Sequence, residues 1–346
     1  MRPCAARFAD QFPRVAEPPS SRIVTVVGAT ATGKTALAVA IAQRRGDMEL
    51  VNADSRQVLR GLRVATLTPT AADLQGVPAH LFAIAEPGRR FTVSDWMRLA
   101  QPCVAAIGAR GNIACLVGGT GLYVRSLING WTFGSVPANA ERREAREATG
   151  REPGGIERLA VELARRDPVA AATIDLHNPR RVVRALEVAD ARSGEMGGVS
   201  GDATPRASVQ IAVDVPRDVH EALVAARVDA MFADDAVVDE VRAALGRGVT
   251  ATVLDTAGIG YREALAVIAG TLDVAGARAA VTRRTLRYAK AQRTWFRGDP
   301  GTTWLRWERS PHEVLEQALD VISARWPAGG CGSPAKAGHA EPANRS

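Results

Sequence analysis

The feature that most constrains this chain is a glycine-rich loop that follows a short apolar run. Residues 23–27 are Ile-Val-Thr-Val-Val, residues 28–35 have the form Gly-x4-Gly-Lys-Thr, and a helical pattern covers 36–45. This order predicts a strand, a phosphate-binding loop and a helix, in which backbone N–H groups and the helix dipole attract an anion. Lys34 adds a positive charge, and the Thr35 hydroxyl can bind magnesium.

The loop does not identify the molecule that carries the phosphate. Nucleotide kinases, GTPases and transferases that release diphosphate all stay open at this point. A GTPase is disfavoured, because the segment Asp255-Thr-Ala-Gly258 lies far beyond the loop and the sequence has no Asn-Lys-x-Asp segment to recognise guanine. The residues predicted to hold the phosphate are Gly28, Ala29, Thr30, Ala31, Thr32, Gly33, Lys34 and Thr35.

Two further apolar runs end in residues that suit the same site. Residues 48–53 predict a strand that leads to Asp54, and residues 112–117 predict a buried strand that leads to a Gly-Gly-Thr-Gly segment containing Thr120. Because the carboxyl ends of parallel strands meet at one edge of a sheet, we expect Asp54 and Thr120 to lie near Lys34. The alternatives are that Asp54 caps the next helix and that the glycines form a tight turn.

Composition divides the chain into a core, an insertion and two ends. We expect residues 21–136 and 205–326 to form one α/β domain, a P-loop NTPase-like parallel sheet flanked by helices. Residues 137–204 have charged amphipathic patterns and predict a smaller helical insertion domain. Residues 1–20 and 327–346 are rich in Pro, Gly, Ala and Ser and predict a disordered extension and a disordered tail.

The charge and the cysteines indicate the environment of the protein. A formal net charge of +7 and a pI near 9.8 favour an anionic partner. The four cysteines have no metal-binding spacing and suit a reducing compartment. The sequence has no apolar run long enough for a membrane span and no apolar stretch of a signal peptide in residues 1–20. We therefore expect a cytoplasmic protein that does not bind membranes.

Residues 278–297 are the most basic part of the chain and contain no acidic residue. As a helix, this segment has one stripe that can follow the phosphates of a nucleic acid and another that can pack on the protein. A solvated basic face without a partner is the alternative. The basic stripe consists of Arg283, Arg287, Lys290 and Arg297, and the packing stripe of Val281, Thr285, Tyr288 and Trp295.

Taken together, five segments resemble the tRNA dimethylallyltransferases, also called tRNA isopentenyltransferases. They match the family in order over roughly residues 22–310, without the zinc finger of some eukaryotic relatives, so the resemblance is to the bacterial type. The segments are residues 28–35, 52–58, 116–123, 178–188, and 258–263 with 287–297.

This resemblance implies transfer of a dimethylallyl group from dimethylallyl diphosphate to a tRNA, with release of diphosphate. The acceptor would be N6 of the adenosine just 3′ of the anticodon, in tRNAs that read codons beginning with U. Asp54 would accept the proton of the attacking amine. Lys34, Thr120, Arg262, and Thr35 with Mg²⁺ would stabilise the charge on the departing diphosphate.

The resemblance also implies contacts with the anticodon stem-loop, from which the target base must leave its stack. We expect the enzyme to act as a monomer. The implied tRNA contacts are Asp54, Ser55, Arg56, Gln57, Thr120, Arg143, Arg180, Arg181, Val182, Val183, Arg184, Gly258, Ile259, Gly260, Tyr261, Arg262, Lys290, Gln292, Arg293, Trp295 and Arg297.

The chain departs from the usual family pattern at a few positions. Ala29 replaces a proline, Leu59 a tyrosine and Thr68 a lysine, while Ala79 and Ala83 replace a histidine and an aspartate. Three other functions remain as alternatives. They are an adenylate isopentenyltransferase that acts on a free nucleotide, a P-loop kinase, and an RNA-binding protein without catalytic activity.

Overall fold

The computed structural model describes residues 22–131, 140–192, 206–307 and 310–327. The chain divides into two compact units, one that combines the segments before residue 129 and after residue 205, and one formed by Asn129–Pro205. We call the described parts of these the core unit and the insertion unit. The extension predicted for residues 1–20 lies outside the described residues, as does the predicted tail apart from its first residue.

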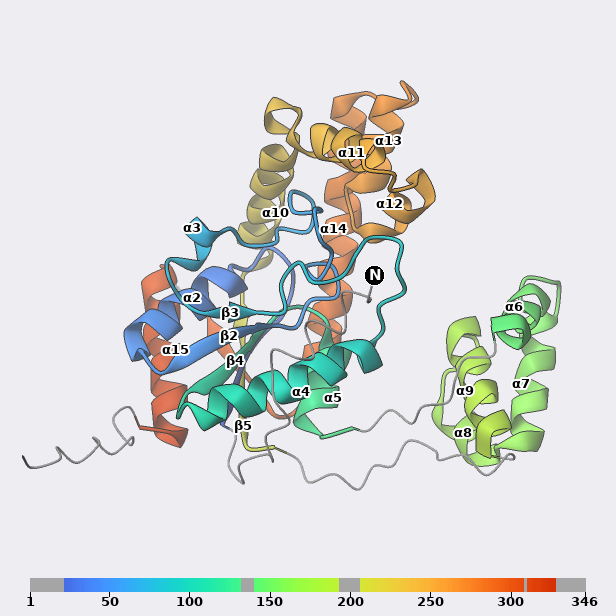
Figure 1. Ribbon diagram of the computed structural model, residues 1–346, viewed down its shortest axis with the longest axis horizontal. Coiled ribbons are helices and arrows are strands. Elements are labelled where there is room, and N and C mark those ends of the chain that lie inside the picture. Colours follow the sequence, from blue (N-terminus) through green and yellow to red (C-terminus); the bar gives the residue numbers. More distant parts are fainter. Residues whose placement is uncertain (1–21, 132–139, 193–205, 308–309, 328–346) are drawn as a thin grey trace, which may run out of the picture. The chain divides into compact units, whose positions relative to one another are not determined.

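The described part of the core unit contains a parallel six-stranded sheet in the order β3-β2-β4-β1-β5-β6 (Figure 1). All residues of β1, β2 and β4 are buried, as apolar runs in a parallel sheet covered on both faces should be. This architecture confirms the predicted α/β class. The strands are β1 (Ile23–Val27), β2 (Met48–Asn52), β3 (Ala79–His80), β4 (Ile113–Val117), β5 (Ser208–Asp214) and β6 (Thr302–Arg306).

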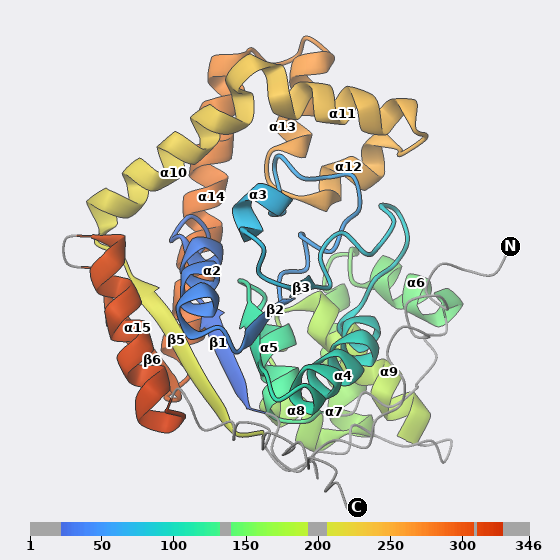
Figure 2. The same cartoon turned by 60° about the vertical axis from the view of Figure 1, so that its left-hand side comes forward.

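Helices cover both faces of this sheet (Figures 1 and 2). Apolar residues of α2 and α15 join the main core cluster on one face. On the other face α4 begins with a capping box between Thr92 and Asp95, and its Trp96 ring stacks on Tyr123 of α5 with the centroids 4.6 Å apart. These helices are α2 (Lys34–Arg45), α4 (Val93–Ala109), α5 (Gly121–Ile128) and α15 (Pro311–Arg325).

A second apolar cluster of the core unit forms among the helices from α10 to α14, in which α10 and α14 run side by side (Figure 2). Leu62 and Ala65 belong to this cluster, so the loop after β2 lies against these helices. Asp255, Thr256 and Ala257 of the segment that resembles a GTPase motif form the end of α12, and Gly258 follows as its C-cap. The remaining elements are α3 (Ala71–Leu74), α10 (Arg217–Phe232), η1 (Ala233–Asp235), α11 (Ala236–Gly246), α12 (Ala251–Ala257), α13 (Tyr261–Ile268) and α14 (Val274–Arg297).

The insertion unit is helical and has a small core of its own, built around Leu159, Leu163 and Leu186. Val182 and Val183, which the resemblance implied as tRNA contacts, are 0% and 2% exposed and belong to this core. Their side chains are not available to RNA, because the apolar face of their helix packs inside the unit. The helices are α6 (Ala140–Thr149), α7 (Gly155–Arg166), α8 (Pro168–Thr173) and α9 (Pro179–Arg192). Among the described helices of both units, none is both long and apolar enough to cross a membrane.

Candidate functional site

The carboxyl ends of β1, β4 and β2 lie next to one another at one edge of the sheet. Val117 of β4 pairs with residues of both β1 and β2. The segment after β4 is fastened to the segment after β2, because Thr120 N donates to Ala53 O at 3.1 Å and Ser55 N donates to the Thr120 hydroxyl at 2.9 Å. The sheet thus brings the phosphate loop, Asp54 and Thr120 to a single edge, as the sequence predicts.

The phosphate loop leads into α2 without a side-chain cap. Gly33 occupies the N-cap position in the left-handed conformation, with φ of 73°, and makes no side-chain cap hydrogen bond. The N–H groups of the first turn therefore remain open to an anion. Lys34 Nζ donates to Ala29 O at 2.5 Å, so its charge lies over the loop.

Asp54 faces the space between the phosphate loop and the segment after β4. One carboxylate oxygen, Oδ1, accepts a hydrogen bond from Arg56 N at 2.8 Å. The other, Oδ2, lies only 3.6 Å from the position that a Cβ at Gly119 would take. The carboxylate therefore caps a turn and keeps one oxygen toward the site, and the alternative that it caps a helix was wrong because residues 55–58 form turns.

The electrostatics of Lys34 depend on Asp54 and on a second cation. Burial lowers the pKa of Lys34 to about 8, while the negative charge of Asp54 acts in the opposite direction and the positive charge of Arg227 adds to the lowering. The charges of Asp54 and Arg227 therefore both act on the ammonium group of Lys34. A bound diphosphate would stabilise both cations.

Arg227 and His220 of α10 contact the phosphate loop, although the sequence analysis did not single them out. The Arg227 guanidinium donates to the Thr30 hydroxyl and, at 3.1 Å, to Ala65 O, while burial lowers its pKa. His220 Nε2 forms a hydrogen bond of 2.9 Å with Thr30 O. The sequence offered one sign of this role, because Arg227 lies next to Val228 on the buried side of a helix. No motif surrounds Arg227 that would have identified it as part of the site.

Gln292 of α14 also belongs to this site. Its side chain is 5% exposed, its Oε1 accepts from Thr30 N at 2.8 Å, and its Nε2 donates to Gly119 O at 3.0 Å. The resemblance implied Gln292 as a tRNA contact, but its burial and its two backbone partners place it inside the protein. The helix turns this residue toward the sheet because Thr285, Ala289 and Phe296 on the same side are buried.

Comparison with known proteins identifies the family. The sequence model of the IPP transferase family matches residues 57–299, and that of the isopentenyl transferases matches residues 21–82. The tRNA dimethylallyltransferase of Streptomyces coelicolor is 40% identical over 290 residues, which are 83% of this chain and 91% of that protein. The chain belongs to the tRNA dimethylallyltransferase family.

Other members support the assignment over nearly the whole chain. The tRNA dimethylallyltransferase of Anaeromyxobacter sp. is 40% identical over 320 residues, which are 89% of this chain and 99% of that protein. The crystal structure of a tRNA isopentenylpyrophosphate transferase from Bacillus halodurans matches with a TM-score of 0.65 at 33% identity, covering 88% of this chain and 97% of that one. These findings confirm the family resemblance, the P-loop NTPase-like fold class and the predicted enzyme class.

The segment from Gly258 to Arg262, which the family resemblance implied as a site and tRNA-binding segment, has other partners in this structure. Arg262 is exposed and forms two hydrogen bonds with Asp255, the second of 2.8 Å, instead of reaching the phosphate loop. Tyr261 is 0% exposed, and its hydroxyl donates to Glu240 at 2.8 Å. A side chain at Gly260 would meet Met231, so this segment packs closely against α10.

The exposed face of α14 carries the basic stripe predicted from the spacing of its residues. Its members Arg283, Arg287, Lys290 and Arg297 are all exposed. Tyr288 and Trp295, which the sequence assigned to the packing stripe, are each 38% exposed, so that assignment was wrong for these two residues. Phe296 is the large ring that the inner face of the helix buries, together with smaller side chains and Gln292, while the rings of Tyr288 and Trp295 remain at the surface.

Trp295 lies close to the segment after β4. Its Nε1 is 2.0 Å from the position that a Cβ at Gly121 would occupy, so Gly121 permits this approach. The Arg125 guanidinium lies 4.9 Å from the ring centroid. The exposed indole is therefore fixed within the core unit near Thr120, where it can present an aromatic surface to a base.

Residues 55–57, also implied as tRNA contacts, connect neighbouring loops of the core unit. The Arg56 guanidinium donates to Thr256 O at 2.7 Å, and Gln57 Nε2 donates to Leu67 O at 2.8 Å. Arg293 is partly buried and donates to Val215 O at 3.2 Å. These contacts hold the loops in place around the carboxyl edge of the sheet.

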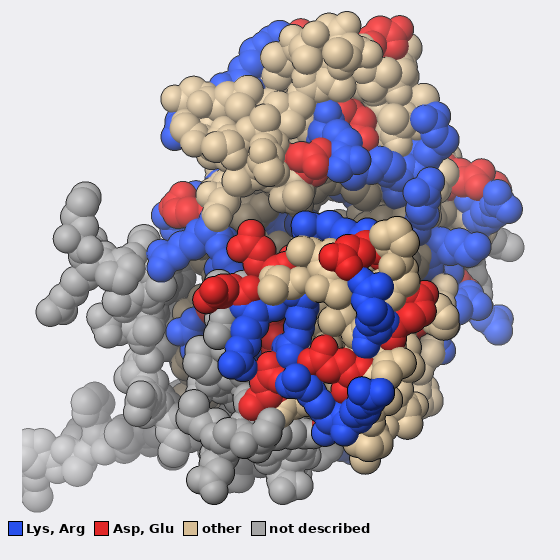
Figure 3. Space-filling model, turned by 90° about the vertical axis from the view of Figure 1, so that its right-hand side faces the viewer, with Lys and Arg blue, Asp and Glu red and all other residues tan. Residues whose placement is uncertain are grey.

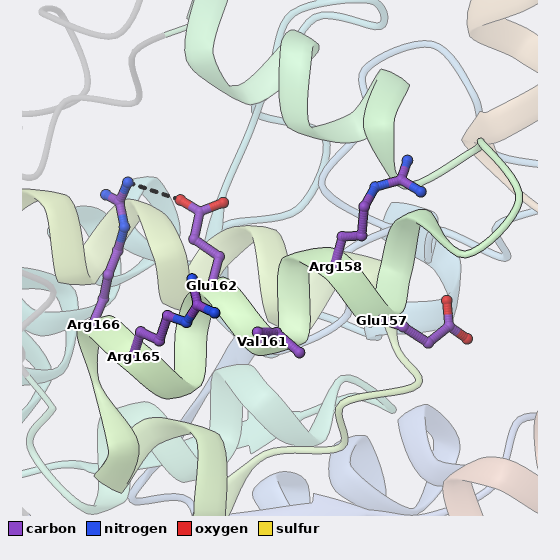
Figure 4. A pocket seen from close by; sticks show the side chains of 6 residues that line it. All are labelled: Glu157, Arg158, Val161, Glu162, Arg165 and Arg166. Carbon is purple, nitrogen blue, oxygen red and sulfur yellow. Dashed lines mark ion pairs between the residues drawn. The ribbon is translucent and has the colours of Figure 1, made fainter.

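Basic and acidic side chains alternate over the insertion unit (Figure 3). Arg143 and Arg184 share the buried carboxylate of Glu187, with hydrogen bonds of 2.8 and 2.9 Å, while Arg180 and Arg181 are exposed. Figure 4 shows a hollow on α7 whose charged lining includes an ion pair of 2.9 Å between Arg166 and Glu162. Its lining residues are Glu157, Arg158, Val161, Glu162, Arg165 and Arg166, none of which has a place in the predicted chemistry.

Proposed function

We propose that the chain transfers a dimethylallyl group from dimethylallyl diphosphate to N6 of the adenosine just 3′ of the anticodon in tRNA, and releases diphosphate. One observation carries this proposal. The carboxylate of Asp54 faces the phosphate loop of residues 28–35, which we call the diphosphate cradle, at one edge of the sheet. Hydrogen bonds also hold Thr120 at this edge. This arrangement supplies a proton acceptor and a site for the leaving group within the same space, which N-alkylation by an allylic diphosphate requires.

The diphosphate binds in the loop of residues 28–35 in this proposal. The uncapped first turn of α2 and the charge of Lys34 support this placement. Arg227 adds a second cation, because it contacts Thr30 from the other side of the loop. As the allylic carbon–oxygen bond breaks, negative charge grows on the diphosphate, and these fixed donors stabilise it most at that stage.

Thr35 fits a role in binding Mg²⁺ together with the diphosphate. Its hydroxyl follows Lys34 on the first turn of α2, next to the place assigned to the phosphates. Within the described residues, no group of three or more acidic, histidine or cysteine side chains could hold a metal ion alone. Thr35 and the substrate phosphates are therefore the oxygen donors that we assign to the ion, which supplies positive charge to the leaving group when bound.

Asp54 acts as the general base in the proposed mechanism. The N6 amine of adenine attacks the allylic carbon, the bond from this carbon to the diphosphate oxygen breaks, and the amine proton passes to the free Asp54 oxygen. Thr120 supports the geometry, because its hydroxyl accepts from Ser55 N and its own N–H donates to Ala53 O. The carboxylate is thereby held next to the entry of the cradle.

The RNA partner is the anticodon stem-loop in this proposal. The exposed arginines and lysine of α14 supply sequence-independent affinity for phosphates, and the indole of Trp295 supplies a stacking surface for an unpaired base. Arg180 and Arg181 contribute similar affinity from the insertion unit, while Arg143 and Arg184, which pair with Glu187, contribute less. We assign the work to a monomer in the cytoplasm, where the tRNA substrate resides.

A product assay tests this function. The pure protein is incubated with dimethylallyl diphosphate, Mg²⁺ and an unmodified anticodon stem-loop, and the RNA is analysed by mass spectrometry. We expect one dimethylallyl group per stem-loop, loss of the product in Asp54→Ala, and normal product in the control Asp239→Ala, which changes an exposed aspartate of α11. Prenylation of AMP in preference to the stem-loop would identify an adenylate isopentenyltransferase, and phosphoryl transfer from ATP would identify a kinase.

A further inference from the structure

Gln292 joins two parts of the active site that are far apart in the sequence. Its Oε1 accepts from Thr30 N of the phosphate loop at 2.8 Å, and its Nε2 donates to Gly119 O after β4 at 3.0 Å. The side chain is 5% exposed, so water does not compete for these hydrogen bonds. A single amide thus fixes the loop relative to the segment that leads to Thr120.

Gly119 has a direct reason to be glycine in this arrangement. A Cβ at this position would lie 2.0 Å from Gln292 Nε2 and 3.6 Å from Asp54 Oδ2. Apart from Gln292 and the two chain neighbours of Gly119, no residue has an atom within 3 Å of this Cβ position, and Gly119 does not have the positive φ that favours glycine. Gly119 therefore leaves room for the Gln292 amide beside the carboxylate of Asp54.

We propose that Gln292 is a positioning residue for the transferase reaction. It holds the phosphate loop at a fixed place relative to Gly119 and hence relative to the carboxylate of Asp54. This inference rests on the proposed function and deepens it, because it assigns to a buried residue of the basic helix α14 a part in binding the diphosphate.

The chemistry of an amide explains why glutamine suits this position. The site requires one acceptor for Thr30 N–H and one donor for Gly119 O, and the two must lie on one planar group. Glutamate provides no donor and adds a negative charge beside the phosphate loop. Methionine has a similar size but leaves the partly buried Thr30 N–H and the buried Gly119 O without their Gln292 partner, which favours rearrangement of the loop.

The test measures inorganic diphosphate binding in the absence of RNA. In Gln292→Met and in Gly119→Ala, we expect the Kd for diphosphate to rise about tenfold to a hundredfold, since each change removes the same two hydrogen bonds. The double variant should have the same Kd as either single variant. The methyl group of Gly119→Ala acts by displacing the Gln292 amide, and Gln292→Met has already removed that amide. Gln292→Glu should bind diphosphate more weakly than Gln292→Met. Thr294→Ala, an exposed change on the same helix, should bind as the wild type does.

Further measurements separate positioning from other roles. The Kd for the anticodon stem-loop should stay within about twofold of the wild type in Gln292→Met, and the rise should appear in KM for dimethylallyl diphosphate more than in kcat under saturating donor. Thermal unfolding of each variant checks that the fold is retained. Gln292→Asn, which keeps the amide but shortens the side chain, should restore less than half of the lost diphosphate affinity.

Three results would overturn the inference. They are an unchanged Kd for diphosphate in Gln292→Met, a loss of stem-loop affinity as the main effect, and additive effects of the Gly119→Ala and Gln292→Met changes. A wild-type protein that binds diphosphate without prenylating any stem-loop would contradict the proposed function but not the positioning role. A wild-type protein that prenylates stem-loops, with a Gln292→Met variant of equal KM and kcat, would contradict the positioning role alone.

Discussion

The lowered pKa of Lys34 makes binding of dimethylallyl diphosphate dependent on pH. Burial lowers the pKa of this ammonium group to about 8 in the free protein, with Asp54 opposing and Arg227 adding to the effect. A bound diphosphate places negative charge beside the ammonium group and raises its pKa again. Above pH 8 the free protein has lost the proton that the complex retains, so binding must take up a proton from solution.

The size of this effect follows from proton linkage. The Kd should be nearly constant from pH 7 to pH 7.5, because the phosphate groups are already ionised and Lys34 is mostly protonated. Above pH 8 the Kd should rise about tenfold per pH unit, or about 1.4 kcal/mol of binding free energy. The same shift acts on folding with a defined sign. The unfolded chain keeps the proton up to the ordinary pKa of 10.5, so the free protein gains stability as the pH rises from about 8 toward 10.5.

Isothermal titration calorimetry can measure both parts of this prediction. Titrations with dimethylallyl diphosphate at pH 9, in buffers of different ionisation enthalpy, should give close to one proton taken up per ligand bound, against a small fraction at pH 7.5. Lys34→Met should bind weakly and without proton uptake. A Kd that stays constant between pH 7.5 and pH 9.5, with no proton uptake in the wild type, would refute the reasoning.

Three other predictions concern the cation, the RNA surface and the core. Arg227→Met should raise KM for dimethylallyl diphosphate about tenfold to a hundredfold in steady-state assays, because Arg227 is a partly buried donor to the phosphate loop. The Kd for the stem-loop should not change. Arg287→Glu should weaken stem-loop binding in fluorescence titrations and leave diphosphate binding normal. The slope of log K against log salt concentration should fall by about 0.7 for each phosphate that Arg287 neutralises in the wild type. Glu49→Gln should lower the free energy of unfolding by about 1–2 kcal/mol in urea titrations, because the buried carboxylate accepts two hydrogen bonds from the partly exposed Arg110. Burial acts to raise the pKa of Glu49, but hydrogen bonds from Arg110, Asn112 and His80 lower it to about 2, so this stability is present above pH 4.5 and is lost as the pH falls toward 2. Unchanged values of these quantities would contradict the roles given to these residues.

The sequence predicted the centre of the site because that centre depends on local order and on sheet topology. An apolar strand, a glycine loop and a helix follow one another without interruption, and parallel strands place the residues after them at one edge. The order of residues along the chain is therefore enough to assign Asp54 and Thr120 to the neighbourhood of Lys34. Their hydrogen bonds follow from the backbone geometry at the ends of adjacent strands.

The residues that were missed or misplaced from the sequence have positions that depend on how the helices pack against the rest of the core unit. Arg227 and His220 meet the phosphate loop only because α10 packs beside it, and no local pattern records that contact. The periodicity of α14 predicted two faces, but docking decided that Gln292 would be buried while Tyr288 and Trp295 would not. Helical spacing alone cannot predict that a polar side chain such as Gln292 is buried with two backbone partners while a large ring such as Trp295 stays exposed.

Departures from the family pattern also become clearer in the structure. Thr68, at the position where a lysine is usual, is 6% exposed and has its hydroxyl 2.8 Å from that of Thr66. In the same loop, Ala65 O accepts a hydrogen bond of 3.1 Å from the guanidinium of Arg227.

The rate of a single turnover tests most directly the claim that Asp54 removes the proton of an attacking amine beside the diphosphate cradle. The enzyme is mixed in excess with a labelled anticodon stem-loop and saturating dimethylallyl diphosphate, and the prenylated RNA is followed over time. We predict that Asp54→Ala lowers this rate at least about a hundredfold while the Kd for the stem-loop stays within about twofold of the wild type. A single-turnover rate close to that of the wild type in Asp54→Ala would contradict the account.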